Sequence, residues 1–265
     1  MRRLTIGLTY AVFFVLLIAP LSRIIAESFS GGIAGLGKAL GRPEAVHALL
    51  MTGSIVVIVT VLNALFGIML SLYLVRAKWL SGKLKRLLNS IVDLPFAVSP
   101  VIGGLMIVLI LGPDSIIGGF LEGIGFKVVY AFPGMVIATL FVTFPLMVRE
   151  VMPVLQEIGL EQEQAASTLG AYGWLTFWKV TWPMIRWAVV YGMVLTIARS
   201  LGEFGAVLVV SGNIMNKTQT ATTLVYQDVE NFNVAAASSV ALVLVTISAG
   251  LLLLMEWVKK RKEVL

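Results

Sequence analysis

The stretch "EQEQAASTLGAYGWLTFWKVTWP", from Glu161 to Pro183, opens with a short polar run between two long apolar segments. Two early carboxylates, Glu161 and Glu163, suit the positive end of a helix dipole. Gly170 is placed to end that helix, and Pro183 marks a further break before the next apolar segment. The pattern predicts a small helix exposed to water inside an otherwise apolar chain.

Two alanines, Ala165 and Ala166, give this helix a slim face that can approach another backbone closely. A short rigid helix of this kind is well shaped to lie in a groove on a soluble partner. It is equally well shaped to rest on a membrane surface as a connector. Shape alone does not separate these two interpretations.

The surroundings of this helix point to a lipid bilayer. The chain is 58% hydrophobic and only 13% charged, with a mean hydropathy of +0.96, whereas about 25% charge is usual in soluble domains. A span needs roughly 20 apolar residues. Six stretches qualify, at about 6–25, 49–75, 87–111, 128–148, 187–210 and 234–258. The first is expected to be an uncleaved span, because no small-residue cleavage motif follows it.

The basic residues set the expected orientation. Fourteen of the 20 Lys and Arg residues fall at the two ends and in the loops that share their side, and five fall on the other side. Both termini and the loop at about 149–186 are therefore expected in the cytoplasm. Because the positive charge follows topology and is not gathered into a groove, a nucleic-acid partner is not expected.

The chain lacks the residues and motifs that several kinds of functional site require. Without cysteine there are no disulfides, thiolate metal sites or cysteine nucleophiles, and a single histidine, His47, leaves almost nothing for an imidazole site. No Gly-x-x-x-x-Gly-Lys-Ser/Thr phosphate loop is present. We therefore expect a non-enzymatic chain that binds no metal or cofactor.

One run, "ARSLGEFGA" at 198–206, places charges inside the fifth span. Arg199 lies 12 residues after Trp187, or about 18 Å along a helix and near the bilayer centre. Glu203 is four residues further, on the same helix face. The two form either a structural pair that fixes helix packing, which is slightly favoured, or a pathway charge that attracts an anion.

The third and fourth spans carry other polar or helix-distorting residues. Asp93 near the cytoplasmic end is expected at headgroup level, and Pro95 and Pro100 should distort the helix. Such distortion is tolerated where it lines a cavity or is covered by neighbours. Together with Ser99 and Thr143, these residues are candidates for lining a pathway.

The cytoplasmic stretch resembles the signature of ABC-importer permeases, which is Glu-Ala-Ala, three residues, Gly, nine residues, then Ile-x-Leu-Pro. Ala165, Ala166 and Gly170 match it, while Gln164 replaces the glutamate and Trp182 the usual leucine. The resemblance implies a six-span bundle of the type I permease kind, with a coupling helix seated in a separate ATPase. It also implies that the ATPase-coupling residues are Glu163, Gln164, Ala165, Ala166, Leu169, Gly170 and Pro183.

Other segments are similar to importers of tetrahedral oxyanions, especially those of the sulfate/thiosulfate type. They are "ARSLGEFGA" followed by "VLVVSGNI", and "FVTFPLMVREVMPVL", "DLPFAVSPVIGGL" and "ENFNVAAASSVALVL". This likeness implies a permease in a prokaryotic cell membrane that imports sulfate or thiosulfate by alternating access. Its expected partners are an ATPase dimer that binds ATP-Mg, a second permease and an extracytoplasmic oxyanion-binding protein.

Three other classes of membrane protein make different demands on the sequence. A molybdate/tungstate permease has the same architecture, and would pair two copies of one chain where the sulfate type pairs two different ones. An ion-coupled carrier would show an inverted repeat and several intramembrane carboxylates, but Glu203 is the only acid well inside a span. An intramembrane enzyme would need a catalytic pair at membrane depth, and His47 has no matching partner.

Overall fold

The computed structural model describes residues 2–77 and 79–263, with the backbone alone at 2–5, 17 and 257–263. The side chains of Arg2, Arg3, Lys78 and the basic cluster 259–262, which contribute to the charge asymmetry, lie outside the described residues. The described chain is built from helices joined by short turns. In order they are α1 (Arg2–Phe13), η1 (Phe14–Ile18), α2 (Ala19–Ser28), α3 (Gly32–Leu40), α4 (Pro43–Arg76), α5 (Gly82–Ala97), α6 (Pro100–Leu111), α7 (Ile116–Gly123), α8 (Phe132–Ile158), α9 (Glu161–Thr168), α10 (Gly173–Thr176), η2 (Phe177–Thr181), α11 (Trp182–Leu201), α12 (Gly205–Ser211), α13 (Ala221–Glu230) and α14 (Val234–Glu263).

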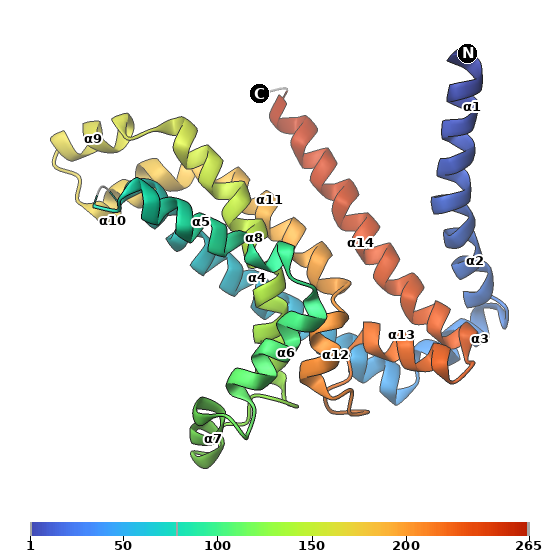
Figure 1. Ribbon diagram of the computed structural model, residues 1–265. Coiled ribbons are helices and arrows are strands. Elements are labelled where there is room, and N and C mark those ends of the chain that lie inside the picture. Colours follow the sequence, from blue (N-terminus) through green and yellow to red (C-terminus); the bar gives the residue numbers. More distant parts are fainter. Residues whose placement is uncertain (1, 78, 264–265) are drawn as a thin grey trace.

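Within the described residues, five continuous helical stretches are long and apolar enough to cross a membrane, and a bent pair of helices makes a sixth if it is counted as one span. The five are Ile6–Ser28, Pro43–Arg76, Phe132–Ile158, Gly173–Leu201 and Val234–Glu256. Figure 1 shows that α1 and the end of α14 point toward the same end of the molecule as α9, while α7 and α13 lie toward the other end. The all-helical membrane bundle predicted from the sequence is confirmed.

The third apolar stretch, expected as a span at 87–111 distorted by its prolines, is sharply bent at Pro100. It holds two helices, α5 and α6, whose axes are bent by 111°. Val98 and Ser99 between them are extended, with ψ of 136° and 137°. The residue before a proline is driven toward extended backbone, and Pro100 lacks the N–H that a continuing helix would need. Ser99 and Pro100 therefore account for the bend.

The fifth span begins earlier and ends earlier than the expected 187–210. Its helix runs without interruption from Gly173 to Leu201, so Pro183 does not make the expected break. Within this helix, the π-helical segment η2 ends at Thr181, two residues before Pro183. A π-turn changes the local hydrogen-bond register, which lets a helix absorb the missing proline N–H.

The cytoplasmic loop expected at 149–186 is also more helical than anticipated. Residues 149–158 are the last turns of α8, and residues from Gly173 onward already belong to the fifth span. Only α9 and the turns beside it lie between these long helices. Helix α8 therefore continues past its apolar stretch into polar last turns. It can do so because a helix satisfies its backbone hydrogen bonds internally, in lipid or in water.

The core forms where α8 packs between α4 and α11 (Figure 1). Met147 of α8 is fully buried and shares a cluster with Val151 and Leu155 of α8 and Ile185 and Val189 of α11. A Cβ on Gly192 would lie 2.7 Å from the Met147 sulfur, so the glycine allows this close approach. The N-terminal helices stand apart from this core, and α2 packs against α14.

Candidate coupling and pathway sites

The short helix α9 is held between two left-handed glycines. Gly159 has φ +71° at the end of α8, and Gly170 has φ +83° just beyond α9. Both values lie in the region that only glycine adopts without strain. The Ala171 N–H donates to the Ala166 carbonyl across the second turn (3.0 Å), which closes the helix end. These turns set α9 across the end of the bundle (Figure 1).

One face of α9 is open to an external partner. Gln164, Ala165 and Thr168 are exposed, and Leu169 just after the helix is 89% exposed. Ala166 is half-buried. An almost fully exposed leucine beside a small-residue face is the composition expected of a docking surface. Of the residues predicted to couple to an ATPase, Gln164, Ala165, Leu169 and Gly170 are exposed on or directly after α9.

Glu163 points the other way, into the bundle. One carboxylate oxygen accepts hydrogen bonds from Arg76 Nη2 (3.0 Å) and from the Thr181 hydroxyl (2.9 Å). The Arg76 and Glu163 side chains are only 16% and 18% exposed, and Arg76 Nη1 also donates to the Leu155 carbonyl (3.4 Å). Glu163 therefore joins α9 to the ends of α4, α8 and η2, instead of lying on the open face.

The intramembrane charges form an ion pair. Arg199 Nη1 lies 2.7 Å from Glu203 Oε2, with the Glu203 side chain only 2% exposed. The other Glu203 oxygen accepts the Ala206 N–H (3.0 Å) at the first turn of α12, and the Glu203 carbonyl accepts the Thr222 hydroxyl (2.7 Å). A carboxylate is favourable at a helix N-terminus, so Glu203 fixes the start of α12 as well as orienting Arg199.

The helix also breaks at residues 202–204, between α11 and α12, and this break lies against the bend between α5 and α6. A Cβ on Gly205 would stand 3.3 Å from Pro100 Cβ and 3.1 Å from Val101 Cγ2, while one on Gly104 would stand 2.7 Å from the Ala206 carbonyl oxygen. Helix α12 therefore packs directly on α6 through glycine. The predicted pathway residues Ser99 and Pro100 lie at this junction.

The other predicted pathway residues take different places. Asp93 makes a two-point ion pair with Arg149 of α8, in which Arg149 Nε lies 2.8 Å from Asp93 Oδ1 and Nη2 bonds Oδ2. Pro95 lies inside α5, the helix that also carries Lys83, Lys85 and Arg86 near its start. Thr143 is fully buried, and its hydroxyl accepts the Asn63 amide (2.7 Å), so it joins α8 to α4.

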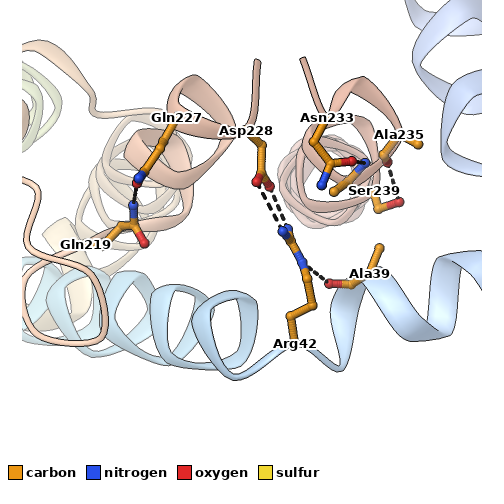
Figure 2. Close-up of polar contacts among 9 residues, drawn as sticks. Ala39, Arg42, Gln219, Gln227, Asp228, Asn233, Ala235 and Ser239 are labelled. Atoms are coloured by element: carbon orange, nitrogen blue, oxygen red, sulfur yellow. Dashed lines mark hydrogen bonds and ion pairs between the residues drawn. The ribbon is translucent and has the colours of Figure 1, made fainter. Parts of the chain in front are cut away.

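A polar network at the end opposite α9 was not predicted. Figure 2 shows the Asp228 carboxylate of α13 facing the Arg42 guanidinium, with Nη1–Oδ1 at 3.1 Å and Nη2–Oδ2 at 2.6 Å. Arg42 Nε also donates to the Ala39 carbonyl (3.1 Å), and Gln219 bonds Gln227 nearby. The bond to Asp228 raises the pKa of Arg42 above its ordinary value. The partners are 186 residues apart, so no local pattern could signal the pair.

We expect Asp228→Ala to destabilise the folded protein by about 1–3 kcal/mol, because it strands a partly buried guanidinium. The readout is the thermal unfolding midpoint of the purified protein in mild detergent. Glu230→Ala is the matched control, since Glu230 is exposed on the same helix and bonds only the neighbouring Tyr226 hydroxyl. Equal midpoints for the two variants would show that the pair contributes nothing to stability.

The described bundle thus has a bent third span and one short, exposed helix between its fourth and fifth spans. Residues 63–264 match the model of the family described as binding-protein-dependent transport system inner membrane component, and the chain belongs to this family. It is 45% identical over 249 residues to the sulfate transport system permease protein CysW of Synechococcus elongatus, covering 94% of this chain and 86% of that relative. It is 37% identical over 261 residues to CysW of Escherichia coli K12, covering 97% and 89%.

Solved structures agree on the fold. The chain resembles the crystal structure of a bacterial alginate ABC transporter in complex with an alginate pentasaccharide-bound periplasmic protein, with a TM-score of 0.79 at 15% identity. The match covers 98% of this chain and 93% of that one. The type I permease architecture predicted from the sequence is thus confirmed.

Proposed function

We propose that this chain is a permease subunit of an ATP-driven importer of sulfate. The observation that carries the proposal is the similarity to sulfate transport permeases at 37–45% identity over nearly the whole chain. The relatives described above are sulfate permeases, so the molybdate/tungstate alternative is not favoured. Family membership also argues against a self-contained ion-coupled carrier.

The exposed face of α9 and the family of the chain support the proposed partners. Its open face, with Ala165 and Leu169, seats in a cleft of a cytoplasmic ATPase dimer, which binds and hydrolyses ATP-Mg. The termini then lie in the cytoplasm, on the side of α9. A second, different permease completes the route, and an extracytoplasmic binding protein delivers the anion to the end that carries Arg42 and Asp228. This chain supplies no metal or cofactor.

The mechanism is a rigid-body change. Closure of the ATPase dimer moves α9, and the Glu163–Arg76–Thr181 contacts carry that displacement to the spans on either side of it. Packed bundles switch between discrete arrangements, so the pathway opens on one side or the other. Selectivity resides largely in the binding protein, because an anion must leave the pathway again after it enters.

The test begins with the tagged chain extracted from its native membrane in mild detergent. We expect mass spectrometry to find a soluble ATPase and a second, non-identical permease in stoichiometric amounts. The complex, reconstituted in proteoliposomes with ATP and its binding protein, should accumulate radiolabelled sulfate. Molybdate should compete poorly. Accumulation of molybdate but not of sulfate would contradict the proposal that sulfate is the substrate. Accumulation of sulfate without any ATPase in the complex would contradict an ATP-driven mechanism.

A further inference from the structure

We propose that Arg199 is the residue through which this chain contacts the transported dianion, and so helps determine specificity for tetrahedral oxyanions in the pathway. The inference rests on the proposed function and adds a specific contact to it. It rests on the exposure of Arg199, the geometry of its pair with Glu203 and the position of that pair beside two helix breaks.

The exposure of Arg199 is unusual for a charged side chain in a span. It lies in the last turn of the fifth span, whose helix runs from Gly173 to Leu201. Its side chain is nevertheless 40% exposed. An arginine that faces lipid is costly, so charged residues within spans usually face water or other protein. In an assembly of two permeases, the water-filled space that such a side chain would face is the translocation pathway.

The pair with Glu203 leaves most of the guanidinium free for another ligand. A guanidinium has five N–H donors, and the described ion pair is a contact between Nη1 and one carboxylate oxygen, Oε2. Arg42 and Arg149, by contrast, each meet an aspartate at two points. Glu203 is buried and also holds the Ala206 N–H. The carboxylate therefore acts as a fixed anchor that orients a half-exposed cation.

The surrounding backbone is that of a pathway lining. Arg199 lies one turn before the break between α11 and α12, and that break packs against the one between α5 and α6 through Gly205 and Pro100. Irregular backbone at membrane depth is tolerated where it is buried in protein or lines a cavity. Broken spans in transporters typically mark the place where substrate passes.

The chemistry of this arrangement suits sulfate better than a monovalent halide. The planar fork of a guanidinium donates two parallel hydrogen bonds to two oxygens of one tetrahedral oxyanion. The neighbouring carboxylate lowers the net charge of the site, which keeps the contact weak. Weak contact is required, because a tightly held anion would not leave.

The experiment compares variants of the reconstituted complex described above, at a saturating concentration of sulfate-loaded binding protein. Arg199→Gln should lower the maximal rate of sulfate uptake about tenfold or more, the usual worth of a hydrogen bond to a charged group. Stimulation of the ATPase by the binding protein should persist, so that ATP is consumed with little import. Arg199→Lys, which keeps the charge and loses the fork, should retain more uptake than Arg199→Gln.

The double variant Arg199→Gln with Glu203→Gln separates this role from a packing role. Two glutamines can still bond each other, and the amide oxygen at 203 can still accept the Ala206 N–H, yet no cation remains. We expect uptake to stay as low as in Arg199→Gln. Uptake restored by the double change would overturn the proposal, and so would a failure of both variants to assemble, since either result assigns the pair to packing. Absence of sulfate uptake by the unaltered complex would instead refute the proposed function.

Discussion

Replacing Glu163 by alanine is expected to lower sulfate uptake roughly tenfold while the ATPase stays bound and active. The side chain lies on the inner side of α9, so its loss leaves the open face unchanged. It removes the acceptor for both Arg76 and Thr181, and charged hydrogen bonds of this kind contribute about 1.5–3 kcal/mol. Movement of α9 would then reach the spans less completely.

The measurement is the ratio of sulfate imported to ATP hydrolysed in proteoliposomes. Glu161→Ala is the matched control, because Glu161 is an exposed carboxylate two residues away on the same helix. Arg76→Ala should lower the ratio to a similar extent, and the double variant with Glu163→Ala should be no worse than either single one. Strictly additive losses would show that the two residues act independently, which would contradict a shared link.

Replacing Leu169 by glutamate should remove the ATPase from the complex altogether. Leu169 is 89% exposed, beside the alanines of α9. Apolar anchors at the centre of an interface commonly contribute about 2 kcal/mol or more, and a buried unpaired carboxylate adds a further penalty. We expect recovery of ATPase with the tagged chain to fall at least about tenfold.

Ile116→Glu is the control for this change. Ile116 is 94% exposed on α7, far from α9 in the bundle (Figure 1), and the substitution introduces the same charge. ATPase recovery should match that of the unaltered chain. If both glutamates lowered recovery equally, the loss would reflect general damage to the membrane subunit, and α9 would not be the docking element.

Much of the architecture could be predicted because lipid imposes simple local rules. Long apolar runs must become helices in a bilayer, since backbone polar groups find no water there. The short polar helix with Ala165, Ala166 and Gly170 also stood out locally, because its composition contrasts with the runs on either side. The pairing of Arg199 with Glu203 was predicted from their spacing of four residues, although α11 ends at Leu201 and Glu203 lies in the break beyond it instead of on the same helix face.

Some of the helix geometry is not registered by hydropathy. Pro100 was predicted to distort the helix at 87–111, but the size of the bend, 111°, is set by the folded backbone. Pro183 was expected to interrupt a helix that instead continues through it, because the preceding π-turn rearranges the hydrogen bonds. The same residue type therefore has opposite effects at two places, depending on the backbone around it.

Hydropathy, charge asymmetry and the cytoplasmic signature were enough to predict an all-helical membrane subunit with an exposed coupling helix, because each depends on neighbours along the chain and on the solvent. The direction of Glu163, the meeting of the two breaks at Gly205 and Pro100, and the pairing of Arg42 with Asp228 depended on how the helices pack. Those contacts join residues from 18 to 186 positions apart, and only the folded bundle brings them within hydrogen-bond or packing distance.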